Sequence, residues 1–248
     1  MRVLFLNTSE TKGGAAIAAK RLMDTLRKDG IDVSMIVRDK ESNDSAVMRI
    51  RSSKWMNKIR FMYERLGIFI YNGFNRENLF AVSQANTGVN ISRYSEVKCA
   101  DIIHLHWINQ GFLSLESIKK LQKTGKPIVW TMHDMWPFTG ICHHAWECER
   151  YSHECGKCPL LNSLKRFDLS FLTLRKKSAI NSNIRMVSVS SWLRGKALMS
   201  SIAQSKDIKV IPNVIDLEVF HPSDKLAARR KYSLPIEKKI ILMGAVRI

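Results

Sequence analysis

The chain opens with residues 3–37, VLFLNTSETKGGAAIAAKRLMDTLRKDGIDVSMIV, which contain two apolar runs separated by a glycine loop and a helical pattern. The continuous apolar run Val3–Leu6 is typical of a strand buried on both faces of a parallel sheet. Ala15–Lys28 carries apolar residues at helical spacing, and Gly30 follows as a C-terminal stop. Ile31–Val37 predicts a second strand. The order strand, loop, helix, strand indicates a βαβ crossover with parallel strands.

The alternation of short strands and helices continues through the chain. It predicts an α/β fold with a Rossmann-like, doubly wound parallel sheet. Further strands are expected at Ile102–His106, Ile128–Thr131, Met186–Val189 and Lys209–Ile211, and further helices at Ser114–Lys123 and Ser191–Ser200.

The domain organisation follows from where this alternation is interrupted and where it resumes. Residues 1–222 are interpreted as one Rossmann-like domain with insertions at about 51–76 and 137–161. Residues 223–248 are interpreted as a linker followed by the strand Ile240–Gly244. We expect this strand to be the first of a second domain that the chain does not complete.

The charge balance favours a function that involves anions. The 248 residues include 40 Lys and Arg against 22 Asp and Glu, a formal net charge of +18. Such a field attracts phosphates, nucleotide sugars, acidic lipid headgroups or nucleic acid, and it also serves solubility alone. No apolar run reaches the ~18 residues that span a bilayer. The N-terminal apolar run is too short for a signal peptide, so a cytoplasmic location is expected.

A first candidate site is the loop Thr8–Gly14, which joins the first strand to the first helix. Gly13 and Gly14 would let backbone N–H groups approach a phosphate, and the following helix N-terminus carries about half a positive charge. Lys12 would add a full charge. The loop has neither dinucleotide-binding nor P-loop spacing, so a plain strand–helix turn is an equal interpretation.

Polar residues also follow two of the predicted strands. Ligands of open α/β sheets bind beyond the carboxyl ends of strands. His104 and His106 lie on the same side of their strand, although His104 fits a hydrogen-bonded core histidine better than a ligand. His133 follows the next strand as a ligand-facing candidate, and Asp134 would orient its ring or cap the residues after it.

Four of the five cysteines fall within one short segment. Four thiolates can supply the tetrahedral coordination of a structural zinc ion. In a reducing cytosol, such clusters more often bind metal than form disulfides. Two local disulfides or free thiols are the alternatives. The expected zinc ligands are Cys142, Cys148, Cys155 and Cys158, with His143, His144 and His153 as substitutes.

The insertion at residues 51–76 is basic and aromatic. Trp, Phe and Tyr interleaved with Lys and Arg suit peripheral contact with an anionic membrane, or single-stranded nucleic acid. An amphipathic helix that packs its apolar face on the core explains the same pattern.

Three segments together resemble glycosyltransferase family 4. Residues 210–222, VIPNVIDLEVFHP, are close to the family's I-P-N-G-V-D signature, and residues 101–107, DIIHLHW, resemble its histidine strand. Residues 130–159, WTMHDMWPFTGICHHAWECERYSHECGKCP, are similar to a bacterial polysaccharide-synthesis subgroup with this cysteine-rich insertion. The resemblance covers essentially the whole chain, in chain order.

The resemblance implies a GT-B fold, in which two Rossmann-like domains face a cleft. The N-terminal domain mainly shapes the acceptor side, and the C-terminal domain mainly binds the nucleotide-sugar donor. Members are retaining transferases, typically without a catalytic divalent metal, and stabilise the leaving diphosphate electrostatically.

The resemblance also implies roles for individual residues. His133 matches the histidine that contacts the donor sugar and is the expected catalytic residue. Val214 stands where the family usually has glycine, which implies an altered turn. The other expected substrate- or donor-binding residues are Lys12, Gly13, Gly14, His106, Asp134, Ser190 (with Ser191 beside it) and Asn213, the last in the hinge signature.

The implied function is transfer of a sugar from a nucleotide-sugar donor to a saccharide or lipid-linked acceptor in cell-surface polysaccharide synthesis. The family's paired glutamates and its Arg/Lys donor-binding pair are expected beyond Ile248, so the chain alone is expected to be inactive. No nucleic-acid partner is expected. The alternatives are a basic, zinc-stabilised nucleic-acid-binding module and a GT-B sugar phosphorylase.

Overall fold

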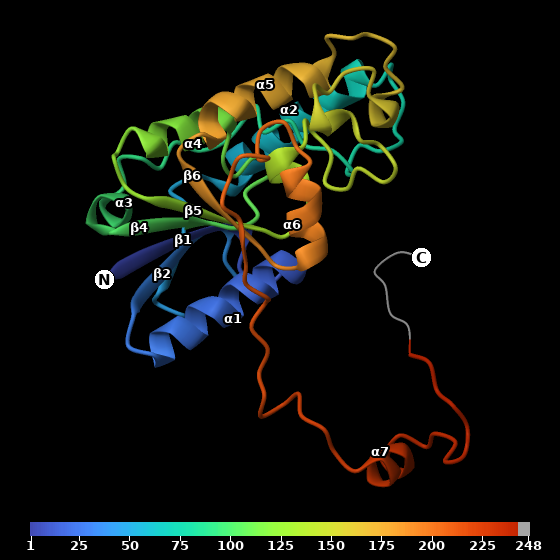
Figure 1. The fold of residues 1–248 in the computed structure, drawn as a ribbon. Helices are drawn as coiled ribbons and strands as arrows, with labels where there is room; N and C mark the ends of the chain where they lie inside the picture. The colour runs from blue at the N-terminus through green and yellow to red at the C-terminus, as the bar shows by residue number, and fades with distance from the viewer. Residues whose placement is uncertain (243–248) are drawn as a thin grey trace. The chain divides into compact units, whose positions relative to one another are not determined.

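A computed structural model of the chain describes residues 1–242, and it contains a seven-stranded parallel sheet with helices on both faces (Figure 1). The order across the sheet is β3-β2-β1-β4-β5-β6-β7. The predicted Rossmann-like, doubly wound fold is therefore confirmed. The strands are β1 (Arg2–Ser9), β2 (Asp32–Asp39), β3 (Val47–Arg49), β4 (Ile102–Leu105), β5 (Ile128–Met132), β6 (Ile184–Ser188) and β7 (Lys209–Val210).

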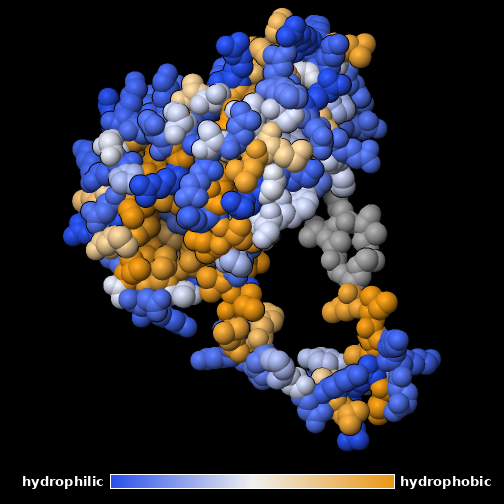
Figure 2. Space-filling model, in the orientation of Figure 1, coloured by the Kyte–Doolittle hydropathy of each residue, from blue (hydrophilic) through white to orange (hydrophobic). Residues whose placement is uncertain are grey.

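The described residues form seven α-helices, and those within Met1–Val214 lie on both faces of the sheet. The seven helices are α1 (Gly14–Lys28), α2 (Lys54–Tyr71), α3 (Ser95–Cys99), α4 (Leu115–Gln122), α5 (Leu169–Asn181), α6 (Ser191–Leu198) and α7 (Lys225–Lys231), with short 3₁₀ turns at Trp136–Phe138, Arg150–Ser152 and Pro159–Leu161. On the face shown in Figure 2, mainly hydrophilic residues cover α4 and α5, as expected for solvent-facing helix surfaces.

The first strand shows why the sheet is covered on both sides. Leu4 and Leu6 point into a cluster that includes apolar residues of α4, whereas Val3 and Phe5 point into a second cluster with apolar residues of α1. The alternation of side chains along a strand places these pairs on opposite faces. A strand that is apolar at every position must be buried on both faces.

Several elements differ from the prediction. The basic aromatic insertion is a single helix, α2, which begins after Ser53, whose side chain accepts a hydrogen bond from the backbone N–H of Met56. The strand β3 and the helix α5 were not predicted, because β3 is only three residues long and α5 follows no clear apolar stripe.

The predicted last strand is not formed in the described part of the chain. Residues 240–242 are in no strand, and residues 243–244 lie outside the described residues. A strand needs a neighbouring strand to receive its backbone hydrogen bonds, and none of the residues 1–242 supplies one here.

The chain divides into two compact units, Met1–Val214 and Ile215–Ile248. The sheet lies entirely in the first unit, and α7 lies in the second. Among residues 1–242, no helix combines the length and apolar character that crossing a bilayer requires.

A buried lysine joins α5 to the segment after β5. Nζ of Lys177 donates hydrogen bonds to the carbonyls of Trp136 (2.6 Å) and Thr139 (3.1 Å), and it lies 3.4 Å from the Trp136 ring centroid. On the next turn of α5, the Asn181 amide donates to the carbonyl of Pro137 (2.8 Å). Burial lowers the pKa of Lys177 well below its ordinary value, despite the nearby thiols and Asp134, which raise it. These bonds satisfy backbone carbonyls that would otherwise be buried without partners.

Replacing this lysine should destabilise the fold strongly. We expect Lys177→Ala to lower the free energy of unfolding by about 2–4 kcal/mol, because it leaves a cavity and buried carbonyls without donors. Lys176→Ala, a change at the exposed neighbouring position of α5, should cost less than about 0.5 kcal/mol. Urea unfolding followed by circular dichroism measures both, and equal losses would contradict the anchoring role.

Candidate functional site

The candidate site lies at the carboxyl edge of the sheet, where the strand order reverses. From β1 the chain proceeds outward through β2 to β3, and it then returns to β4 on the other side of β1. Crevices at such switch points are the usual ligand sites of open α/β sheets. The residues that follow β1, β4, β5 and β6 therefore share this edge.

Hydrogen bonds join the ends of β1 and β4. The backbone N–H of Trp107 donates to the Asn7 side-chain carbonyl (2.9 Å), and the N–H of Thr8 donates to the carbonyl of Trp107 (2.8 Å). The Thr8 hydroxyl donates to the carbonyl of Asn109 (2.9 Å). Asn7 is the polar residue that follows the apolar run Val3–Leu6, and this position in the sequence would have identified it.

Three histidines form a row across β4 and β5. The rings of His104 and His106 stack with centroids 4.4 Å apart, as their shared side of the strand predicts, and those of His106 and His133 stack at 5.3 Å. Nδ1 of His106 and Nε2 of His133 are 3.0 Å apart, so one of the two nitrogens donates a hydrogen bond to the other. Nε2 of His104 is 2.8 Å from the Thr131 hydroxyl. This bond fits the core interpretation of His104.

Burial keeps this row uncharged near neutral pH. It lowers the pKa of His104 to about 4, with a further contribution from His133. Burial also lowers the pKa of His133 to about 4, although the negative charge of Asp134 acts in the opposite direction. Burial also lowers the pKa of His106 well below its usual range. Neutral imidazoles can both donate and accept hydrogen bonds, which suits binding of an uncharged polar ligand.

The Asp134 carboxylate, beside the row of histidines, accepts several hydrogen bonds. It accepts from the indole N–H of Trp107 (2.9 Å), from Nδ1 of His143 (2.7 Å) and from the backbone N–H of Trp136 (2.9 Å). Burial raises the pKa of Asp134, but His143 and these hydrogen bonds outweigh it, and the pKa is lowered. Asp134 thus caps the residues that follow it, and no hydrogen bond to the His133 ring occurs among residues 1–242.

His143 has a different role from the one predicted for it. The sequence marked it as a substitute zinc ligand, but both ring nitrogens are engaged, Nδ1 by Asp134 and Nε2 by the Ser83 hydroxyl at 2.9 Å. It therefore has no free nitrogen for a metal and instead connects the cysteine-rich segment to the site. Ser83 lies far from the site in sequence and carried no local signal.

The glycine loop presents an open helix N-terminus. Gly13 precedes α1 with φ of 94°, a conformation that favours glycine, and no side chain in the described part of the chain caps the helix. A Cβ at Gly13 or Gly14 would meet nothing within 4 Å. Backbone N–H groups at this end are thus accessible to an anion.

The charge of Lys12 is partly compensated. Its ammonium group lies 2.6 Å from the Glu41 carboxylate. The hydrogen bond to Glu41 raises the pKa of Lys12, so the group stays cationic while paired. The sequence suggested that Lys12 adds a full positive charge to the loop, and the structure places that charge in an exposed ion pair.

Of the two remaining predicted residues, Ser190 lies on the same edge of the sheet, and Asn213 lies beyond the last strand. Ser190 follows β6 and caps α6, and its hydroxyl accepts from the N–H of Leu193 (3.2 Å). Asn213 is exposed and lies after β7, near the end of the first unit. The structure therefore brings His106, His133 and Asp134 together, with Ser190 on the same edge.

The four clustered cysteines surround one small space. Together they line a cavity of about 20 Å³, enough for about one water-sized group. All are free thiols. Burial raises the pKa of Cys155 and of Cys158 to about 12. Within residues 1–242, no group of three or more His, Cys, Asp or Glu side chains is placed to hold a metal ion. The structural zinc thus remains a prediction.

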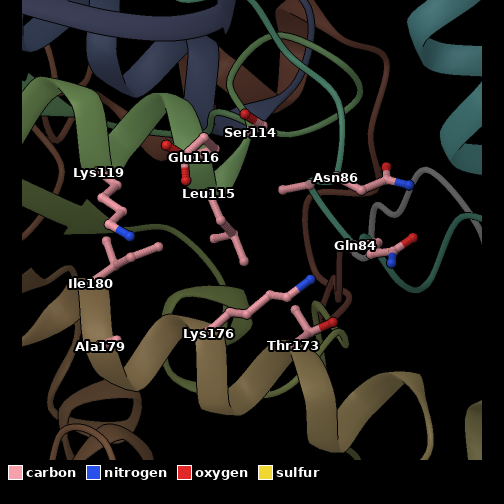
Figure 3. A pocket seen from close by; sticks show the side chains of 11 residues that line it. Gln84, Asn86, Ser114, Leu115, Glu116, Lys119, Thr173, Lys176, Ala179 and Ile180 are labelled. Carbon is pink, nitrogen blue, oxygen red and sulfur yellow. The ribbon is translucent and has the colours of Figure 1, made fainter.

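Of the larger cavities in the described residues, two lie away from both the histidine row and the cysteine-rich segment. One, of about 400 Å³, lies between α4 and α5 (Figure 3). Its lining includes the charged residues Glu116, Lys119 and Lys176 as well as neutral side chains. The other, of about 460 Å³, lies beside the glycine loop and is lined largely by cations.

Comparisons with known proteins agree with the sequence signatures. The model of the family described as Glycosyltransferase Family 4 matches residues 12–219. A protein of Escherichia coli (strain K12) that carries the name colanic acid biosynthesis glycosyl transferase WcaC is 26% identical over 169 residues, which are 66% of this chain and 40% of that protein. The chain thus spans less than half the length of this curated relative.

A solved structure of MoeE5 in complex with UDP-glucuronic acid and NAD is more distant. It is 12% identical, and the alignment covers 76% of this chain and 53% of that chain with a TM-score of 0.33. A likeness of this extent supports no argument about function.

The neutral histidines should make the fold sensitive to acid. A histidine with a pKa of 6.5 when unfolded and about 4 when folded contributes stability above pH 6.5, and this contribution is lost as the pH falls towards 4. One such group contributes on the order of 3 kcal/mol. His104→Gln should reduce the loss of stability over this pH range, whereas His153→Gln, at an exposed position, should not. Urea midpoints measured from pH 7 to pH 4 compare them, and unchanged acid sensitivity in His104→Gln would refute the assignment.

The cysteine cluster predicts bound zinc. We expect about one zinc ion per purified chain by elemental analysis, and loss of most of it in the Cys155→Ala/Cys158→Ala variant. Cys99→Ala, which alters the cysteine outside the cluster, should keep the metal. Less than about half an equivalent in the unaltered chain, together with titratable disulfides, would reject a four-thiolate site.

Proposed function

Because the chain belongs to glycosyltransferase family 4, we propose that it forms the acceptor-side part of an enzyme that transfers a sugar from a nucleotide-sugar donor. The acceptor is a saccharide or a lipid-linked saccharide, and the reaction belongs to cell-surface polysaccharide synthesis. The relative from Escherichia coli, named for colanic acid biosynthesis, supports the assignment to polysaccharide synthesis. Since the chain spans 40% of that relative, the reaction is proposed for the complete protein.

The observation that carries this proposal is the uncharged histidine row at the switch point of the sheet. His133 is half-buried, and its Nε2 is engaged by His106. Its Nδ1 makes no hydrogen bond within residues 1–242 and is not among the fully buried atoms that lack a partner there. A neutral imidazole held in this way can bind a sugar hydroxyl, and in the transition state it can stabilise charge that develops on the sugar.

The neighbouring groups fix the position of the ring. His106 is held by stacking against His104 and by the hydrogen bond to His133. Asp134 fixes the segment after β5 through Trp107 and Trp136. Such preorganisation lowers the barrier because little reorganisation is needed when the reaction occurs.

The glycine loop is proposed to face the donor diphosphate. The open N-terminus of α1 would stabilise negative charge as the nucleoside diphosphate leaves. We assign the reaction to the retaining class without a catalytic divalent metal, in line with the family resemblance. This family also accounts for the parallel sheet and the Pro-Asn signature, which the nucleic-acid-binding alternative leaves unexplained.

Removing the His133 imidazole should impair transfer in the complete enzyme. We expect His133→Ala to lower kcat/KM by roughly 10²–10³-fold, because a contact that strengthens in the transition state is lost. His153→Ala, at an exposed position of the cysteine-rich segment, should retain activity. Steady-state release of nucleoside diphosphate in the presence of acceptor measures both variants, and unchanged turnover in His133→Ala would disprove the proposed role.

A further inference from the structure

A cationic cavity lies next to the glycine loop, on the side of β1 away from the histidine row. It has a volume of about 460 Å³. The ends of β2 and β3, the glycine loop and the first two turns of α2 contribute to it. Its charged lining consists of Lys12, Arg38, Lys40, Arg49, Lys54 and Lys58, against Asp39 and Glu41.

Two of the cations are already paired with these carboxylates. Lys12 lies 2.6 Å from Glu41, and Arg38 lies 2.6 Å from Asp39. Arg38 also donates to the carbonyl of Gln110, which fixes it at the wall of the cavity. The two acidic groups of the lining are thus neutralised by two of its six cations.

The other four cations have no carboxylate partner in the described part of the chain. Lys40 donates to the carbonyl of Asp44 (2.8 Å), and Arg49 donates to the carbonyl of Ser52 (2.9 Å). Lys54 and Lys58 are exposed, one turn apart on α2, and make no hydrogen bond or ion pair within residues 1–242. The cavity therefore keeps an uncompensated charge of about +4, which favours an anion with more than one negative charge.

An exposed apolar stripe runs along α2 beside these lysines. Trp55, Ile59, Met62 and Leu66 recur every three or four residues, and their exposed fractions are 70%, 39%, 54% and 54%. The buried side of α2 is formed instead by other residues, among them Ile68. The stripe is therefore not the face that packs on the core, contrary to the simplest interpretation of the sequence pattern.

From this juxtaposition we propose that the cavity binds the phosphate or diphosphate group of a lipid, while the hydrocarbon chain of that lipid lies along the apolar stripe of α2. The inference rests on the proposed function and specifies its acceptor as lipid-linked. Lys54 and Lys58 lie at the boundary between the cavity and the stripe, where a charged headgroup meets its hydrocarbon chain. Interfacial helices combine cationic and apolar residues in this way.

The composition of the stripe favours hydrocarbon over nucleic-acid bases. Three of its four residues, Ile59, Met62 and Leu66, are not aromatic and offer no face for base stacking. Long aliphatic side chains next to a tryptophan match the boundary between headgroups and acyl chains.

The test measures binding of the chain to vesicles and to a soluble anion. We expect co-sedimentation with phosphatidylcholine vesicles that contain phosphatidic acid and not with phosphatidylcholine alone, and we expect inorganic diphosphate to compete. Lys54→Ala/Lys58→Ala should weaken vesicle binding roughly thirtyfold, because two cations near the surface are lost. Trp55→Ala/Leu66→Ala should weaken vesicle binding but leave the affinity for diphosphate, measured by calorimetry, unchanged.

The matched control removes the same charge elsewhere. Lys119→Ala/Lys120→Ala changes two exposed lysines of α4 and should bind vesicles as the unaltered chain does. Equal weakening by both double variants would show a non-specific charge effect and overturn the proposal. Binding of diphosphate without binding to vesicles would indicate a soluble anion and would also overturn it. Because no turnover is measured, these results are independent of the transfer reaction and of the His133 test.

Discussion

The structure depends on the pairing of β1 with β4 at the centre of the sheet. The paired residues are mainly apolar, and Val3–Leu6 are all buried. Asn7 then accepts a hydrogen bond from the backbone N–H of Trp107 where the pairing ends. This junction joins Asn7 and Thr8 to Trp107 and Asn109, although about a hundred residues separate them in sequence. The glycine loop and the histidine row lie on a common edge because these two strands are neighbours.

Burial then determines the chemistry of that edge. The same packing that stabilises the sheet buries His106 and partly buries His104 and His133, and this burial keeps their rings neutral. The buried Lys177 donates a hydrogen bond to the segment after β5, at the carbonyl of Trp136. His143 links the same segment to the cysteine-rich segment through its hydrogen bond with Asp134. The site is therefore uncharged at the histidines and cationic at the cavity beside the glycine loop. This division is consistent with the proposed transfer, in which a neutral sugar and anionic phosphates are bound at separate places.

The sequence predicted the fold well because buried parallel strands leave a direct signal. Continuous apolar runs such as Val3–Leu6 identified the central strands. The ends of two such runs suggested His106 and His133 as candidates, and the structure places these two rings together. Residues that act through distant contacts were not predictable in this way. Ser83 reaches His143 across sixty positions of sequence, and nothing near it marks that contact. The helix α5 was missed because its buried face mixes apolar residues with polar ones such as Lys177 and Asn181, which leaves no continuous apolar stripe in the sequence.

The most direct test of the central claim is a crystal structure of the complete enzyme with a non-hydrolysable nucleotide-sugar analogue. The account predicts a hydroxyl of the donor sugar within about 3 Å of a ring nitrogen of His133, with the diphosphate near the N-terminus of α1. A donor sugar bound away from the edge shared by β1, β4 and β5, with His133 in contact only with protein, would contradict it.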